Sequence, residues 1–185
     1  MKRFYTGNGD DGYSGLLAEG RVPKHHGLFE TIGTIDEVSA VLGVARAKSK
    51  TEKIKDVVLD VQRDLYHMMA EIAATYCDPS IFRHINSERI SWLEERTNEF
   101  SETVAVPSGF ILPGDTESSA FFALSRTITR RAERRYAQLL HSGELKNPEI
   151  LRYLNRLSSL CFVLELVEIF TAKIQKPIMA NNRRS

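Results

Sequence analysis

The sequence predicts an all-α fold, an up-and-down bundle of five helices preceded by an extended N-terminal loop arm. Apolar residues recur at helical spacing in five segments with short connections, no segment shows a convincing strand pattern, and most glycines precede residue 34. The 185 residues are 42% hydrophobic and 26% charged, which is typical of a soluble globular domain. We therefore expect one domain over 1–185, with an arm at 1–33, the bundle at 34–176 and a frayed tail at 177–185.

Composition and charge argue against several functions. The net charge is +1, which gives no overall positive field to hold nucleic acid, and no run of about 18 apolar residues predicts a membrane span. The N-terminus MKRFYTGNGDDG resembles neither a signal peptide nor a transit segment. Cys77 and Cys161 are the two cysteines, far apart in apolar helical contexts, so we expect two buried thiols in a reduced cytoplasmic protein.

The arm contains a glycine-rich stretch, YTGNGDDGYS, that suits a ligand loop. Glycines let backbone N–H groups approach a ligand closely, small polar side chains add hydrogen bonds, and the two aspartates either hold Mg²⁺ through water or order the loop. The stretch lacks a Walker ending and precedes no helix, so a structural turn and a phosphate cradle both stay open. The cation that follows, Lys24, reaches either a phosphate or water. The candidate contacts in the stretch are Thr6, Gly9, Asp10, Gly12 and Ser14.

The first three helices follow from start and stop signals. Thr34 to Glu37 has the form of a capping box, so we expect the first helix to begin near Thr34, with Asp36 in its first turn. An acid there favours the helix dipole, and it could also bind an arginine. The second helix is expected over 51–76 and the third from Asn86 or Ser87. A loop over 103–110 then brings Phe110 to the start of the fourth helix.

The fourth helix, from Thr116 to Ser142, contains the most unusual stretch of the chain. Arg126, Arg130 and Arg134 stand four apart, and each step turns only about 40° around the axis, so they form one row. A charge run of this kind is usually a solvated face in which an acid, here Glu133, pairs with a neighbouring arginine. A row of guanidinium groups also suits a polyphosphate. The row alone does not decide between the two interpretations.

The fifth helix is expected over 148–176, and Asn155 interrupts its apolar stripe. A buried amide needs partners, so Asn155 forms either a helix-to-helix hydrogen bond or a ligand contact. A bundle of this size also suggests a ferritin-like di-iron protein. That chemistry needs inward Glu-x-x-His pairs, which the sequence lacks.

Five segments in this order, YTGNGDDGYS, RVPK, GTIDE, FILPGDTESSAFFALSRTITRRAERR and LRYLNRLS, resemble the PduO-type ATP:cob(I)alamin adenosyltransferases. The resemblance extends from Tyr5 to about Leu164, and RxxxRRAERR and LNRLS are its specific parts. It implies a cobalamin adenosyltransferase-like five-helix bundle that assembles as a homotrimer. MgATP would bind at the subunit interfaces, with cobalamin, the corrinoid substrate, beside it.

The resemblance also implies roles for individual residues. Asp36 and Arg126 match an ion pair across the interface, and Phe110 matches the residue that fills the lower face of the corrin and leaves cobalt without an axial ligand. Glu133 would contact Mg²⁺. The candidate catalytic residues are Asp36, Phe110, Arg126 and Arg130. The positions that match ATP contacts are Thr6, Gly9, Asp10, Gly12, Ser14, Lys24, Arg130, Glu133, Arg134 and Asn155.

The implied reaction is displacement at the 5′ carbon of ATP by cob(I)alamin, with release of triphosphate. Cob(II)alamin, a flavoprotein reductase and an adenosylcobalamin-dependent enzyme are the partners that such chemistry would involve. The chain departs from the family pattern at Gly7, Asn8, Gly15, Ser159 and the pair Glu165-Leu166, and so loses one loop cation and one cation of the last helix. The alternative function is therefore a nucleotide or corrinoid carrier or sensor without turnover.

Overall fold

The computed structural model describes residues 4–174 and 176–181. Within these residues it shows five α-helices and one short 3-10 helix, so the predicted all-α bundle is confirmed. A two-stranded antiparallel sheet in the arm was not predicted, because strands of two residues are too short to show alternation. The elements are β1 (Tyr13–Ser14), β2 (Val22–Pro23), α1 (Gly27–Lys48), α2 (Glu52–Ala73), η1 (Pro79–Phe82), α3 (Ser87–Ser101), α4 (Glu117–His141) and α5 (Pro148–Thr171).

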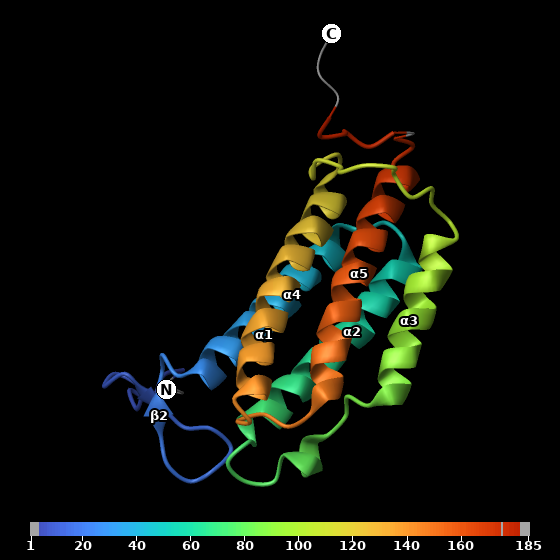
Figure 1. Ribbon diagram of the computed structural model, residues 1–185. Helices are drawn as coiled ribbons and strands as arrows, with labels where there is room; N and C mark the ends of the chain where they lie inside the picture. Colours follow the sequence, from blue (N-terminus) through green and yellow to red (C-terminus); the bar gives the residue numbers. More distant parts are fainter. Residues whose placement is uncertain (1–3, 175, 182–185) are drawn as a thin grey trace.

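The helices pack as layers around one apolar core. Figure 1 shows α4 and α5 side by side in front, α1 and α2 behind them, and α3 along the outer side of α5. Burying an aliphatic or Phe side chain stabilises the fold by about 1.5–3 kcal/mol, so the core fixes α4 against α5. The fully buried side chains include Leu28, Ile35, Leu65, Phe122 and Tyr153.

Helix α1 begins at Gly27, and the predicted start near Thr34 is wrong. The ring of His26 accepts a hydrogen bond from the Leu28 N–H at 3.3 Å and so caps the helix. Leu28 is fully buried, so the extra turns before Thr34 are held by the core. The Thr34 hydroxyl donates to the Glu30 carbonyl at 2.6 Å inside the helix. The arm therefore ends at residue 26, and 27–33 belong to the bundle.

The starts of α3 and α4 are confirmed. Asn86 caps α3 by accepting from the Arg89 N–H at 3.0 Å. Thr116 and Ser119 form a reciprocal capping box at the start of α4. Helices α2 and α5 are shorter than expected, because α2 ends at Ala73 and α5 ends at Thr171.

The expectation of a frayed tail at 177–185 is wrong for the part that the structure describes. The Leu112 N–H donates to the Ile178 carbonyl at 2.7 Å, and the Ala180 N–H donates to the Phe110 carbonyl at 2.9 Å. These bonds lay residues 178–180 along the loop that carries Phe110, and the two segments lie side by side at one end of the bundle in Figure 1. The rest of the predicted tail, 182–185, lies outside the described residues.

The two cysteines differ in their exposure to solvent. Cys161 is buried as expected, whereas Cys77 is exposed, which corrects the prediction of two buried thiols. Cys77 follows the end of α2, where the arm passes, and its thiol donates to the Leu17 carbonyl at 3.3 Å. Among the described residues, no helix is long and apolar enough to cross a membrane.

Candidate functional site

The arginines of α4 divide into two groups. Arg131 and Arg135 face α1, where Arg131 pairs with Glu37 and Arg135 Nη1 lies 2.7 Å from the Glu30 carboxylate. The other three, Arg126, Arg130 and Arg134, make no ion pair or side-chain hydrogen bond with any residue that the structure describes. We call these three the arginine row. The row is therefore available for an external anion.

Glu133 does not neutralise the arginine row. Its Oε1 atom accepts from Asn155 Nδ2 on α5 at 2.9 Å, so the structure does not support the solvated-face interpretation, in which Glu133 would pair with an arginine. Asn155 in turn accepts from Arg156 Nη1 at 2.8 Å, and Arg156 Nε donates to Glu94 of α3 at 2.9 Å. Asn155 thus forms a helix-to-helix hydrogen bond, one of the two alternatives that the sequence left open.

A cavity of about 600 Å³ brings part of the predicted site together. Phe110, from the loop before α4, is 85% exposed, so its ring is not packed into the core. Arg126 and Arg130 of the row line the cavity from α4, and the opposite wall is α5. The lining residues are Pro107, Ser108, Gly109, Phe110, Ile111, Pro113, Arg126, Arg130, Ser158, Ser159, Phe162, Val163 and Glu165.

Glu165 is a buried acid in the wall of this cavity. It is 2% exposed, and loss of hydration raises its pKa to about 7, although Arg126 opposes the shift. Glu165 Oε1 and Arg126 Nε are both buried and make no hydrogen bond within the described residues. No role in the site was predicted for Glu165 from the sequence. The available signal was an acid between Leu164 and Leu166 in an otherwise apolar stripe.

The arm holds the predicted nucleotide loop in a compact shape. The Lys24 N–H donates to the Gly12 carbonyl at 2.9 Å, and Gly12 has a φ of +81°, which favours glycine. A Cβ added at Gly9 would lie 2.7 Å from Lys24 Nζ, so this glycine allows the ammonium group to lie against the loop. Elsewhere in the loop, the Asn8 N–H donates to Thr6 Oγ1 at 3.3 Å, the Asp10 N–H donates to the Gly7 carbonyl at 3.2 Å, and Ser14 pairs with Val22 in the sheet.

Arg21 holds this loop together, although no role was predicted for it from the sequence. Its Nη2 atom donates to the Tyr13 carbonyl at 2.8 Å and to Asp11 Oδ1 at 2.7 Å. The Arg21 guanidinium also holds the pKa of the Asp11 carboxyl below its ordinary value. The ion pair between Arg21 and Asp11 therefore stabilises the conformation of the loop itself.

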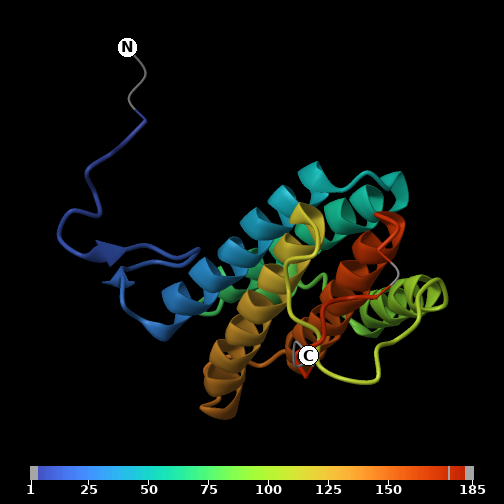
Figure 2. The same ribbon diagram turned by 90° about the horizontal axis from the view of Figure 1, so that it is seen from above.

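The arm and the arginine row are not joined within one chain. No hydrogen bond or ion pair connects residues 4–26 to Arg126, Arg130 or Arg134 in the described part, and Figure 2 shows the arm extending away from the bundle. Asp36 is exposed on α1 and makes no ion pair with Arg126 in the described single chain. The predicted site residues therefore form separate groups.

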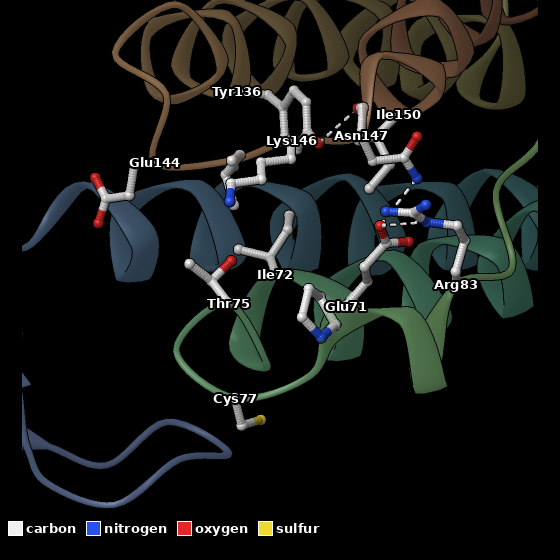
Figure 3. A pocket seen from close by; sticks show the side chains of 12 residues that line it. Glu71, Ile72, Thr75, Cys77, Arg83, Tyr136, Glu144, Lys146, Asn147 and Ile150 are labelled. Carbon is white, nitrogen blue, oxygen red and sulfur yellow. Dashed lines mark hydrogen bonds and ion pairs between the residues drawn. The ribbon is translucent and has the colours of Figure 1, made fainter.

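A second cavity of about 140 Å³ lies near the end of α2. Figure 3 shows Glu71, Arg83 and Asn147 turned toward one another in its wall. Asn147 Nδ2 donates to Glu71 Oε1 at 2.9 Å, and the Tyr136 hydroxyl donates to the Asn147 carbonyl at 2.8 Å. These groups mainly bond to one another and link α2, α4 and the start of α5. We therefore assign them a role in stabilising the bundle.

Comparison with known proteins shows which family the chain belongs to. The family model described as cobalamin adenosyltransferase matches residues 4–168. The chain belongs to this family. The corrinoid adenosyltransferase PduO of Salmonella typhimurium is 34% identical to this adenosyltransferase family member over 166 residues, which cover 89% of this chain and 49% of that protein. The chain therefore spans about half the length of that PduO relative.

Other adenosyltransferase relatives match over most of their length. The corrinoid adenosyltransferase of Bacillus subtilis is 34% identical, with 86% of this chain and 83% of that protein covered. A variant PduO-type ATP:corrinoid adenosyltransferase from Lactobacillus reuteri, complexed with cobalamin and ATP, superposes with a TM-score of 0.89 at 26% identity over 97% of both chains. Another variant of that enzyme, complexed with ATP, superposes with a TM-score of 0.85 at 26% identity over 96% of this chain and 100% of that chain.

Among the described residues of this adenosyltransferase family member, no cluster of three or more His, Cys, Asp or Glu side chains could hold a metal ion by itself. Glu133 lies on α4 beside the arginine row, and among the described residues only its Oε1 atom accepts a hydrogen bond, from Asn155. Its second oxygen is available for a ligand. Magnesium is usually bound through one or two carboxylates together with substrate phosphates, and Glu133 fits that pattern.

Proposed function

We propose that this protein transfers the 5′-deoxyadenosyl group of ATP to the cobalt of reduced cobalamin and releases triphosphate. The observation that carries the proposal is the arginine row, which has no internal ion pair among the described residues and from which Arg126 and Arg130 border a cavity that Phe110 also lines. The names of the relatives, which are corrinoid adenosyltransferases, support it. The solved relative that was complexed with cobalamin and ATP also supports it.

The chemistry needs positive charge more than it needs a protein nucleophile. The electron pair of Co(I) forms the bond to C5′ of ATP, and the C5′–O bond breaks with its electron pair moving to triphosphate. Negative charge therefore grows on the leaving group and must be met by groups already in position. Arg130 and Arg134 present planar donor forks that match phosphate oxygens, and Lys24 adds a point cation. Cobalt itself is the nucleophile.

Phe110 supplies the apolar side of the site. A phenyl ring that is 85% exposed leaves a large apolar surface in water, and covering that surface with the lower face of a corrin would be favourable. A ring in that position excludes water and side-chain ligands from cobalt. The metal would then be left without an axial ligand on that face and would be easier to reduce.

We also propose that the complete site lies between subunits of a homotrimer. Within one chain no hydrogen bond or ion pair joins residues 4–26 to the arginine row, so the arm of one subunit would close over the row of its neighbour. Asp36 of one subunit would then pair with Arg126 of the next. Thr6, Gly9, Asp10, Gly12 and Ser14 would surround the nucleotide from the arm, and Glu133 would contact Mg²⁺ bound to the phosphates.

The reaction also needs partners and a compartment. Cobalt must reach the Co(I) state from cob(II)alamin, so we propose a flavoprotein reductase as electron donor and an adenosylcobalamin-dependent enzyme as recipient of the product. We propose the cytoplasm as the location, where the two free thiols would stay reduced.

A single-turnover experiment tests the proposed function. Anaerobic mixing of the protein with cob(I)alamin and MgATP should convert the absorbance spectrum of reduced cobalamin to that of the alkylated form and release equimolar triphosphate. A spectral shift without triphosphate would instead support the carrier or sensor function. A purely structural bundle predicts no stabilisation by MgATP, whereas a ligand at 100 times its Kd adds about 2.7 kcal/mol.

A further inference from the structure

We infer that Glu165 and Arg126 together recognise a primary amide at the edge of the corrinoid, and that Glu165 selects corrinoids that carry an amide at that position over corrinoids that carry a carboxylate. The inference rests on the proposed function, because it assumes that a corrinoid enters the cavity beside Phe110. It makes Glu165 a specificity-determining residue of that site.

The first observation is the position of the two groups. Glu165 comes from α5 and Arg126 from α4, and both line the cavity of about 600 Å³. In the single chain, each has a buried polar atom without a hydrogen-bond partner in the described residues, Glu165 Oε1 and Arg126 Nε. The guanidinium of Arg126 has five N–H groups, so it can serve both the proposed pair with Asp36 and a ligand. A buried donor or acceptor that stays unpaired is unfavourable, so a complementary ligand group would remove two such penalties at once.

The second observation is a contrast with the next acid of α5. Glu168 is also buried, at 5% exposed, but both of its oxygens accept hydrogen bonds, one from Ser49 and one from the Ser118 hydroxyl at 2.6 Å. Glu168 therefore joins α5 to the end of α1 and the start of α4. Glu165, three residues earlier, has no comparable set of donors among the described residues and lies on the wall of the cavity. A structural role explains Glu168 and leaves Glu165 unexplained.

The chemistry of the pair matches a primary amide. An amide carbonyl accepts a hydrogen bond from the guanidinium of Arg126, and its NH₂ group donates to the carboxylate of Glu165. Cobalamin carries acetamide and propionamide side chains around its ring. A carboxylate in place of such an amide would lack the donor and would face Glu165 with like charge, which opposes binding at a desolvated contact.

The remaining lining of the cavity fits the edge of a macrocycle. Phe162 and Val163 on α5 and Ile111 in the loop before α4 give it apolar walls. Ligand sites are commonly apolar with a few placed polar groups that fix orientation, and Glu165 and Arg126 supply such groups here. The cavity would thus receive the apolar ring edge together with one of its amide arms.

A binding competition tests the inference without using turnover. Full-length protein with saturating MgATP is titrated at pH 8 with cob(II)alamin and with each of its propionate-bearing monocarboxylic acids, and binding is followed by absorbance. We expect at least one monocarboxylic acid to bind about tenfold or more weakly than cob(II)alamin. In Glu165→Gln, which keeps the side-chain size and removes the charge, that preference should fall to about threefold or less, because Arg126 then attracts the carboxylate.

Glu168→Gln is the matched control, since it makes the same chemical change in the same helix away from the cavity. Its preference should equal that of the wild type even if its stability falls. Equal binding of cob(II)alamin and every monocarboxylic acid by the wild type would overturn the inference and leave the proposed function intact, as would an unchanged preference in Glu165→Gln. Failure of cob(II)alamin itself to bind would overturn the proposed function.

Discussion

Asn155 Nδ2 of α5 lies 2.9 Å from Oε1 of Glu133 on α4, and this hydrogen bond joins the two helices that form the wall of the candidate site. It orients the Glu133 carboxylate beside the arginine row without neutralising any of the three arginines. In the proposed function, this bond orients the carboxylate that would contact Mg²⁺ on the nucleotide.

Asn155→Ala removes this orientation, and we expect the Kd for MgATP to rise about tenfold, because a hydrogen bond to a charged group contributes about 1.5–3 kcal/mol. Isothermal titration measures the affinity. Arg152→Ala is the control, because it breaks only the exposed pair between Arg152 and Glu149 on the same helix. An Asn155→Ala protein that binds MgATP as tightly as Arg152→Ala would contradict the proposed role.

The division of the arginines predicts different effects of neighbouring substitutions. Arg130→Ala should lower the single-turnover rate by about 100-fold or more, because it removes a cation from the leaving group. Arg131→Ala, which breaks only the exposed pair with Glu37, should change the rate by about threefold or less. Stopped-flow absorbance gives both rates. Similar losses in the two variants would show that the row has no separate role.

The docked C-terminal segment predicts an effect on Phe110. Deleting residues 177–185 removes the backbone hydrogen bonds that the Phe110 carbonyl and the Leu112 N–H make with residues 178–180. We expect the transfer rate to fall about tenfold while the Kd for ATP is unchanged, because the loop is no longer fixed in position. Phe110→Ala should show the same pattern. Weaker ATP binding in the truncated protein, at unchanged helicity, would mean that the segment serves the nucleotide instead.

Glu165 makes stability depend on pH. Burial raises its pKa from the 4.5 of a free glutamate side chain to about 7, so the folded protein keeps a proton that the unfolded chain releases above pH 4.5. The free energy of unfolding therefore falls as pH rises through this window, by about 3 kcal/mol in total. Glu165→Gln lacks this loss. Its stability relative to the wild type should rise between pH 4.5 and pH 8 in urea titrations, and a constant difference would contradict the burial effect.

A buried hydrogen-bond network between α2, α3 and α5 predicts an effect on stability. Asp64 of α2 is 1% exposed and accepts from Arg89 Nη2 and from the Tyr153 hydroxyl, each at 2.6 Å. Asp64→Ala leaves the Arg89 charge partly buried without its partner, so we expect the free energy of unfolding to fall by about 3–5 kcal/mol. Tyr153→Phe removes one hydrogen bond and should cost about 1–2 kcal/mol. Urea denaturation measures both values, and a loss below about 1 kcal/mol in Asp64→Ala would contradict this account.

Local sequence signals predicted most of the fold. The capping residues Asn86 and Thr116 located the starts of α3 and α4 correctly, because the hydrogen bonds of a helix cap are made within three residues. The start of α1 was misplaced, because residues 34–37 have the sequence of a capping box although Thr34 lies inside the helix. Its hydroxyl donates to a carbonyl of the preceding turn. The true start of α1 depends on the burial of Leu28, which is a contact with other helices and leaves no local signal.

The candidate site was predictable in composition but not in arrangement. The spacing of Arg126, Arg130 and Arg134 indicated the row directly, since a helix of 3.6 residues per turn places them on one face. Which arginines are already paired depends on where Glu30 and Glu37 of α1 lie against α4, and this follows only from packing.

The sequence by itself indicated an all-α bundle and a row of arginines on one helix, because periodicity and residue spacing are properties of a single element. Five segments along the chain also carried the resemblance to an adenosyltransferase family. Tertiary structure alone decided that Phe110 and two of these arginines share a cavity with Glu165, and that residues 178–180 dock on the Phe110 loop. These are contacts between segments distant along the chain. Their pairing is set by how the helices pack, and no local pattern in the sequence encodes it.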